Sequence, residues 1–331
     1  MTTRSLSPAV TSRHSPDRVD IMGFGEQDRY RGCILGLAVG DAVGTVVEFQ
    51  PRGTFEPITD MVGGGPFRLC PGQWTDDTSM ALCLAASLVE CGRFDPLDQM
   101  GRYLRWMDRG YMSSTGSCFD IGNTTRRALE SFKRTGDPFS GPREPNSAGN
   151  GSIMRLAPVP MYCHPDRTAA LELAAESSRT THGTPECLDA CRVLSAVLWS
   201  ALSGHSKEAV LGAATDLELE SEGVRQIAMR TYRRKAQDEI SGTGYVVASL
   251  EAALWCFDQT SSFRDAVLSA TNLGDDADTT AAVCGQVAGA FYGASGIPEP
   301  WLEKLANARR DRCPRRCLGG NATRLGLPSR G

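Results

Sequence analysis

Histidine is scarce in this sequence, and its cysteines are not paired at short spacing. Only four histidines occur among the 331 residues, and the twelve cysteines are scattered through apolar segments without a C-x-x-C pair. A histidine-rich metal site and a C-x-x-C zinc or redox motif are therefore excluded. Buried free thiols in an intracellular protein are the simpler interpretation.

Long apolar runs and excess positive charge are also missing. We find no apolar run of the roughly 18 residues that cross a bilayer, and no signal-peptide core at the N-terminus. The formal net charge of −4 gives no overall attraction for nucleic acid or anionic lipid. We therefore expect a soluble, cytoplasmic monomer with neither a nucleic-acid nor a membrane partner.

The chain is long enough for one large core, because 41% of its residues are hydrophobic. Residues 1–27 are rich in serine, arginine and proline without apolar periodicity, which predicts a flexible tail. Residues 306–331 are arginine-rich and predict a basic C-terminal tail that could contact an acidic partner. We expect the folded domain to span residues 28–305.

Apolar periodicity predicts an all-α fold. The sequence has no alternation of strands with helices and no Rossmann fingerprint, and only residues 155–162 could form a strand. Helices are predicted at 94–106, from about 126, and at 171–178, 186–203, 207–217, 222–236 and 246–257.

Two apolar segments carry glycines at helical spacing. Glycine costs a helix about 1 kcal/mol relative to alanine, so a stripe of glycines needs a reason. Close approach of another backbone is that reason, and we expect the two segments to pack together. The stripes are Gly32, Gly36, Gly40 and Gly44 in the first segment and Gly285, Gly289 and Gly293 in the second.

Acidic residues gather at two points, each directly before an alanine-rich run. Asp76 and Asp77 precede residues 79–89, and a second group precedes residues 281–291. Helix capping explains one carboxylate per helix but not a cluster, since converging carboxylates repel unless a cation neutralises them. Oxygen ligands of this kind suit Mg²⁺ or Mn²⁺. The second group is Asp275, Asp276 and Asp278.

Glu48 follows Asp41 by seven residues, which is two turns on one helix face if the helix continues. If the helix continues, Glu48 adds a carboxylate to the acidic site. If it does not, Glu48 lies exposed at the helix end. Two glycine-rich loops, at 111–125 and 146–155, have the composition of anion seats, because their backbone N–H groups can approach a phosphate. The second is not a Walker loop.

Taken together and in order, these motifs resemble those of the ADP-ribosylglycohydrolases. The resemblance covers residues 28–305 and is strongest to the dinitrogenase reductase-activating branch, which removes ADP-ribose from arginine. The motifs are Gly40-Asp41 with Glu48, Thr75-Asp76-Asp77-Thr78, Asp120 to Thr125, Gly149-Asn150-Gly151 with Met154-Arg155, Thr181-His182, and Gly274 to Thr279.

The resemblance implies a compact all-α fold with two Mg²⁺ or Mn²⁺ ions at the bottom of a cleft. One ion would be held by Thr75, Asp76, Asp77 and Asp278. The other would be held by Asp276, Asp278 and Thr279, and in some members a glutamate that Glu48 matches reaches this ion. Asp120 matches an aspartate near the bond that is cleaved. The implied catalytic residues are Asp120, Asp77, Asp276 and Glu48.

The same resemblance implies a substrate pocket that holds ADP-ribose above the ions. On its own, His182 would be a structural histidine; the motif gives it a place in this pocket. The lining residues would be Gly116, Ser117, Cys118, Phe119, Asn150, Gly151, Ser152, Met154, His182 and Tyr245.

The predicted function is therefore hydrolysis of the N-glycosidic bond between ADP-ribose and an arginine of a modified protein. Such cleavage needs the ribose held, water supplied and the leaving group's proton managed. Two alternatives stay open. The chain could be a binding protein that neutralises an ADP-ribosyltransferase through its N-terminal tail, or a hydrolase of ADP-ribosyl-serine or O-acetyl-ADP-ribose.

Overall fold

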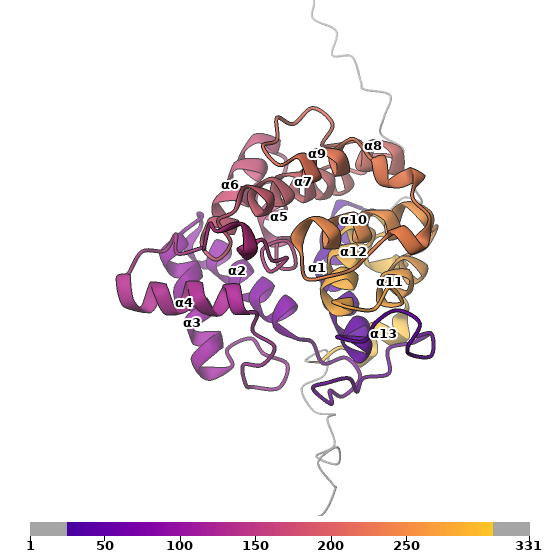
Figure 1. Cartoon of the computed structure of the whole chain (residues 1–331), viewed down its shortest axis with the longest axis horizontal. Helices are drawn as coiled ribbons and strands as arrows, with labels where there is room; N and C mark the ends of the chain where they lie inside the picture. Colours follow the sequence, from indigo (N-terminus) through magenta and orange to yellow (C-terminus); the bar gives the residue numbers. More distant parts are fainter. Residues whose placement is uncertain (1–24, 307–331) are drawn as a thin grey trace, which may run out of the picture.

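The computed structural model describes residues 25–306, and within this range the chain forms helices joined by loops, with three isolated β-bridges and no strand (Figure 1). The all-α prediction is confirmed. The α-helices are α1 Glu26–Gly44, α2 Asp76–Cys91, α3 Pro96–Arg109, α4 Asn123–Thr135, α5 Pro158–Cys163, α6 Arg167–Arg179, α7 Pro185–Leu202, α8 Lys207–Leu211, α9 Glu222–Ala228, α10 Val246–Gln259, α11 Phe263–Thr271, α12 Ala277–Tyr292 and α13 Glu299–Lys304.

Helices α1 and α12 run antiparallel at the centre of the fold, with backbone against backbone. A Cβ on Gly36 would lie only 2.2 Å from the carbonyl oxygen of Gly285. Further along the pair, a Cβ on Gly40 would lie 2.1 Å from the carbonyl oxygen of Ala281. No side chain fits in such gaps, so the expectation that the two glycine stripes pack together is confirmed.

The first helix is more apolar than we expected. The stretch Glu26–Val47 is long and apolar enough to cross a membrane, with a mean hydropathy of 1.3, so the expectation that no run has this length is wrong. Its most apolar window is 72% buried inside the fold. The apolar surface packs mainly on α12 and the core around it.

Several boundaries differ from the predictions. Residues 155–162 do not form a strand, because Pro158 begins helix α5. Helix α8 ends at Leu211 rather than at 217, and α9 ends at Ala228 because Arg230 takes a left-handed backbone conformation with φ 60°. Helices α11 and α13 were not predicted. Most of the two predicted tails, residues 1–24 and 307–331, lies outside the described residues, so the tail assignments remain predictions.

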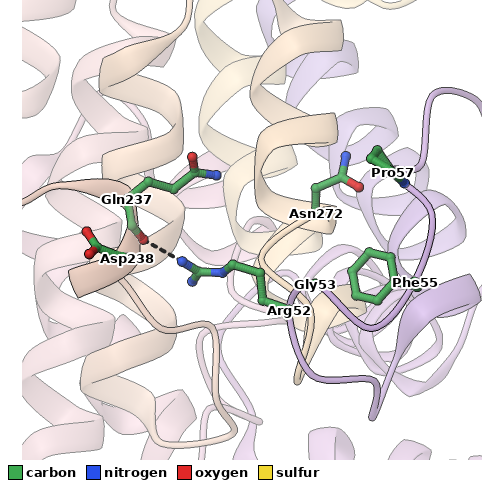
Figure 2. Close-up of a pocket in the computed structure, with 7 residues that line it drawn as sticks. All are labelled: Arg52, Gly53, Phe55, Pro57, Gln237, Asp238 and Asn272. Carbon is green, nitrogen blue, oxygen red and sulfur yellow. Dashed lines mark hydrogen bonds between the residues drawn. The ribbon is translucent and has the colours of Figure 1, made fainter.

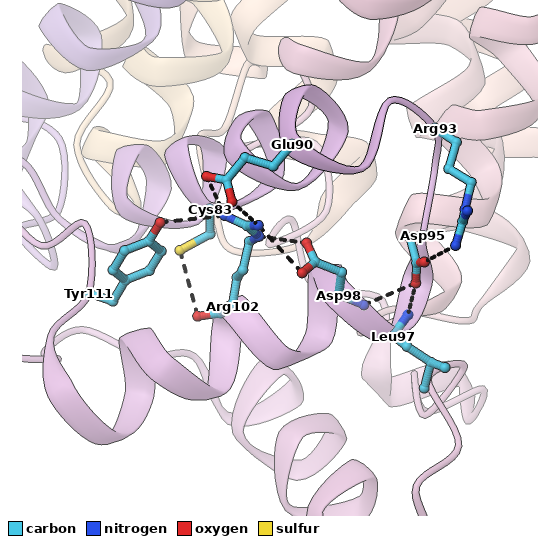
Figure 3. A network of polar contacts seen from close by, with 8 residues as sticks. All are labelled: Cys83, Glu90, Arg93, Asp95, Leu97, Asp98, Arg102 and Tyr111. Atoms are coloured by element: carbon cyan, nitrogen blue, oxygen red, sulfur yellow. Dashed lines mark hydrogen bonds and ion pairs between the residues drawn. The ribbon is translucent and has the colours of Figure 1, made fainter.

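A buried arginine fastens α3 to α2 (Figure 3). Arg102 is 4% exposed, and its guanidinium donates to Glu90 at 2.7 Å and to Asp98 at 2.5 Å. It also donates to the Tyr111 hydroxyl at 3.5 Å. Tyr111 begins the loop that leads to α4, so this network fixes the base of that loop.

Replacing Gly36 by alanine should destabilise the fold strongly. The new methyl group meets the Gly285 carbonyl, and overpacking against a backbone costs about 3 kcal/mol or more. The measurement is the midpoint of urea unfolding. Gly101→Ala in α3 is the matched control, since its Cβ would meet nothing within 4 Å. There alanine should raise stability by about 0.5–1 kcal/mol. Equal effects of the two variants would contradict the assigned role of the α1–α12 contact.

Candidate active site

Asp41 connects the end of α1 to the beginning of α2. One carboxylate oxygen accepts from the Thr75 amide at 2.9 Å, and the other accepts from the Thr78 amide at 3.0 Å and hydroxyl at 2.6 Å. A carboxylate from another helix therefore caps α2. The α1–α12 contact places Gly44, at the end of α1, beside Ala277, at the start of α12. The N-termini of α2 and α12 are thus brought to one place.

The two predicted acidic groups meet there. The Thr75 hydroxyl lies 3.2 Å from an Asp77 oxygen and 3.3 Å from an Asp278 oxygen. The Thr279 hydroxyl lies 3.3 Å from the same Asp77 oxygen. Asp77 and Asp278 are buried, and Asp76 follows Thr75 at the start of α2 with 7% exposure. Residues from opposite ends of the chain thus form one oxygen-rich cluster.

Asp41 belongs to this cluster although it was not among the predicted site residues. Its oxygen lies within 4.8 Å of oxygens of Asp77 and Asp278. Its two oxygens already accept four hydrogen bonds from Thr75 and Thr78, so we assign it to holding α2 rather than to binding a cation. One sequence pattern could have indicated this position: Asp41 directly follows Gly40 of the glycine stripe, and the residues around such a stripe are buried.

Glu48 reaches the cluster by a route different from the predicted one. Helix α1 ends at Gly44, and the chain turns through the 3-10 helix Thr45–Val47, so Glu48 does not share a helix face with Asp41. Glu48 is nevertheless buried, and a carboxylate oxygen lies within 4.8 Å of oxygens of Asp120 and Asp278. The alternative that Glu48 lies exposed is wrong.

Asp120 enters from the loop before α4 with a strained backbone. Its φ is 58°, a left-handed conformation that is uncommon for residues other than glycine. The loop is tied to the entry of α2, because Trp74 donates to the Met112 carbonyl at 3.3 Å and Ser114 donates to the Trp74 carbonyl at 2.6 Å. These ties maintain the strained conformation and keep the Asp120 carboxylate at the cluster.

The crowding of carboxylates shifts their pKa values upward. Burial, followed by the charge of Asp120, raises the pKa of Glu48 to about 10. Burial, followed by the charge of Asp276, raises the pKa of Asp120 to about 7. Burial is also the main cause that raises the pKa values of Asp77 and Asp278 well above the usual range. The cluster therefore resists full ionisation unless a positive charge joins it.

The arrangement fits a divalent cation. No lysine or arginine of residues 25–306 pairs with these acids, while Oδ1 of Asp77 and Oε2 of Glu48 are buried without a hydrogen-bond donor. Unpaired buried carboxylate oxygens are costly, and carboxylate and hydroxyl oxygens are the ligands that hard cations take. The cluster can therefore hold a metal ion.

Asp276 links the acidic cluster to the second glycine loop. Its carboxylate accepts from the Asn150 amide group at 3.0 Å. The Asn150 backbone donates to the Gly244 carbonyl at 3.1 Å, and an antiparallel bridge pairs Gly149 with Tyr245. The Tyr245 side chain remains 47% exposed. This loop therefore borders the acidic cluster through Asn150, and contact of the loop or of Tyr245 with substrate stays a prediction.

The remaining predicted pocket residues lie in three settings. On the Asp120 loop, Gly116 and Ser117 are exposed, while Cys118 and Phe119 are half-buried. Ser152 and His182 are buried near the second glycine loop. Met154 packs in a small hydrophobic cluster of the core beneath that loop, which also contains Tyr103 and Trp106. Contact of any of these residues with substrate stays a prediction.

A recess beside the acidic cluster was not predicted (Figure 2). Its volume is about 520 Å³, and it is lined by Arg52, Gly53, Phe55, Pro57, Gln237, Asp238 and Asn272. Asn272 lies beside Pro57, and Gln237 and Asp238 lie on the opposite side (Figure 2). Arg52 holds its walls together by donating to the carbonyls of Gln237 and Ile240. The neighbouring bridge between Pro51 and Gly274 adjoins the acidic segment that precedes α12.

Known proteins that resemble this chain in sequence or structure are ADP-ribosyl hydrolases and related proteins. The ADP-ribosylarginine hydrolase Tri1 of Pseudomonas putida is 48% identical over 84% of this chain and 74% of its own length. The ADP-ribosyl-(dinitrogen reductase) glycohydrolase of Rhodospirillum rubrum is 34% identical over 84% of this chain and 90% of its own length. A solved structure of an ADP-ribosylglycohydrolase-related protein complex matches 85% of this chain and 93% of its own, with 46% identity and a TM-score of 0.74.

The family resemblance inferred from the motifs is confirmed. A model of the ADP-ribosylglycohydrolase family matches residues 25–325, which is nearly the whole chain. The acidic residues of these motifs include the ones that the fold gathers in one cluster, namely Asp41, Glu48, Asp77, Asp120 and Asp278. The chain therefore belongs to the ADP-ribosylglycohydrolase family.

Proposed function

We propose that this protein is a metal-dependent hydrolase that removes ADP-ribose from modified arginine side chains of a protein. The observation that carries the proposal is the convergence of buried carboxylates from α1, α2 and α12 with Glu48 and Asp120. The identity with ADP-ribosylarginine hydrolases over most of the chain supports the arginine linkage.

The cofactors in this proposal are two divalent cations, Mg²⁺ or Mn²⁺. One would be held by Thr75, Asp76, Asp77 and Asp278, and the other by Asp276, Asp278 and Thr279. When bound, such ions supply positive charge that orients ribose hydroxyls and lowers the pKa of a water molecule. Two buried oxygens that lack donors, one on Asp77 and one on Glu48, support a positive charge at this place.

Asp120 and Asp276 are the acids that the substrate would meet first, because they keep some exposure while Asp77 and Asp278 do not. Hydrolysis joins a water oxygen to ribose C1, breaks the C1–N bond and delivers a proton to the guanidine nitrogen. In this proposal Asp120 pairs with the guanidinium or carries that proton, and a pKa raised by burial to about 7 supports the second role. Glu48 stands behind Asp120 and keeps its proton to higher pH.

The alternative contact with an ADP-ribosyltransferase would use residues 1–27, most of which lie outside the described part of the chain. The binding-protein alternative therefore stays a prediction about that tail.

The linkage preference can be measured directly. We expect release of ADP-ribose from an arginine-modified protein in the presence of Mg²⁺ or Mn²⁺, and much slower release from a serine-modified protein or from O-acetyl-ADP-ribose. The assay is quantification of free ADP-ribose against time. Cleavage of the serine linkage alone would overturn the arginine assignment.

Substitution of Asp77 separates the catalytic from the structural role of the cluster. Asp77→Asn should lower hydrolysis by roughly a hundredfold or more, because a cation at this site supplies several kcal/mol of charge stabilisation. The same change should leave the melting temperature of the metal-free protein equal or higher, since it removes one repelling carboxylate.

The control is Asp238→Asn, which changes an exposed carboxylate outside the cluster. It should alter neither activity nor the rise in melting temperature on adding Mn²⁺. That rise should disappear in Asp77→Asn. If Asp77→Asn kept full activity, the metal assignment would be wrong.

The metal-free protein should lose stability as pH rises. Acids with raised folded-state pKa values bind more protons folded than unfolded, so the free energy of unfolding falls between the unfolded value near pH 4 and the folded value. Burial raises the pKa of Asp41 to about 6 and that of Asp120 to about 7, which places the part of the loss due to these two acids between about pH 4 and 7. Melting temperatures in chelator should therefore fall across this range, and Mn²⁺ should oppose the fall. A rising curve in chelator would contradict the assignment.

A further inference from the structure

A positive charge is buried in the core without a carboxylate partner. The side chain of Arg155 is fully buried, and among residues 25–306 its Nε and Nη1 atoms have no acceptor. The guanidinium stacks on the ring of Tyr103, with 4.9 Å between its carbon and the ring centroid. An unpaired buried cation costs several kcal/mol, so stability alone does not account for this residue.

The remaining guanidinium nitrogen of Arg155, Nη2, makes a directed contact. It donates to the Thr181 hydroxyl oxygen and, at 3.5 Å, to the Ser177 carbonyl. Arginine has no acceptor, so the Thr181 oxygen must accept in this bond. The Thr181 proton is then free to donate, and the one further partner of this hydroxyl among the described residues is Nδ1 of His182, at 2.9 Å.

These contacts favour one tautomer of His182, because the Thr181 proton has no other acceptor among residues 25–306 if Nδ1 does not accept it. If the Thr181 hydroxyl donates to Nδ1, then Nδ1 carries no proton and Nε2 carries it in the neutral ring. The backbone of His182 is held on both sides by Ser178, whose carbonyl accepts from the His182 amide at 2.7 Å and whose hydroxyl donates to the His182 carbonyl at 2.8 Å. The ring therefore has a fixed direction as well as a fixed tautomer.

Nε2 of His182 lies directly under the second glycine loop. A Cβ on Gly151 would lie 3.1 Å from this nitrogen, and a Cβ on Gly149 would lie 3.4 Å from it. No acceptor for Nε2 is present within residues 25–306. A Cβ on Gly151 would also lie 3.3 Å from the Thr125 hydroxyl, so this hydroxyl and the ring nitrogen border the same space. The loop itself borders the acidic cluster through Asn150.

We propose that Arg155 and Thr181 are positioning residues that lock His182 as a neutral Nε2–H donor for an oxygen of the ADP-ribosyl group. The substrate part of the inference rests on the proposed function, in which that group lies against the loop of Gly149 to Gly151. Burial, with a smaller contribution from the Arg155 charge, lowers the pKa of His182 to about 3, which agrees with a neutral ring. Arg155 touches no substrate and acts through Thr181.

The tautomer can be read from the full-length protein by long-range proton–nitrogen NMR after labelling its histidines with ¹⁵N. Only four histidines are present, and His182→Gln identifies the signal of interest. We expect a protonated Nε2 and an unprotonated, hydrogen-bonded Nδ1 from pH 6 to 8. A protonated Nδ1 or a charged ring in the wild type would overturn the proposal without any variant being needed.

Two pairs of variants test the relay. Thr181→Val removes the hydroxyl and should move the Nδ1 signal to that of a free acceptor, while Thr181→Ser should keep the wild-type position. Arg155→Met should give two tautomers or a raised pKa of His182, and Arg155→Lys should restore part of the wild-type signal. Unchanged nitrogen shifts in Thr181→Val and Arg155→Met would overturn the proposal.

Steady-state kinetics test whether His182 donates to the substrate. Loss of one aligned hydrogen bond should raise KM for ADP-ribosyl-arginine about tenfold in Thr181→Val, with a smaller change in kcat and recovery in Thr181→Ser. The expected tautomer with an unchanged KM would overturn the donor role. Absence of hydrolysis by the wild type would instead refute the proposed function, and the NMR result would stand apart from it.

Discussion

The contact between α1 and α12 is the constraint on which the active site depends. Its glycines bring two backbones closer than any side chain permits, which fixes both the distance and the register of the helices. Gly44 then lies against Ala277, so the end of α1 meets the beginning of α12. Asp41 extends the contact to α2 by capping it. Without this chain of contacts, the two acidic segments would have no reason to meet.

The clustered carboxylates lower the stability of the fold that brings them together. Burial and mutual repulsion raise their pKa values, and two oxygens have no donor. The fold tolerates this because the surroundings are rigid: Trp74 ties the loop of Asp120 to the entry of α2, and Arg52 ties the segment after Glu48 to the loops before α12. The site is unfavourable without a cation, but its carboxylates are already in place. A cation that binds therefore does not spend binding energy on bringing them together.

The sequence predicted those features whose cause is local. Glycine spacing predicted the helix pair, and acids before alanine-rich runs predicted the cluster, because each pattern has a physical reason within a few residues. The route by which Glu48 reaches the cluster could not be predicted, since it depends on α1 ending at Gly44 and on the 3-10 turn that follows. The capping role of Asp41 was missed for a similar reason. Its four donors belong to Thr75, directly before α2, and to Thr78 in its first turn, and they meet Asp41 only when the helices pack. Periodicity likewise missed α11 and the short α13.

Asp41 and Arg155 illustrate a common use of buried charge in this protein. Neither has an oppositely charged partner among the described residues, and each directs its hydrogen bonds to threonine hydroxyls, of Thr75 and Thr78 in one case and of Thr181 in the other. A hydroxyl that is bonded to a charge has its remaining donor or acceptor capacity fixed. Thr75 is thereby oriented toward the acidic cluster, and Thr181 toward His182. The charges are costly to bury, but they set the direction of neutral groups that face the site, which apolar packing cannot do.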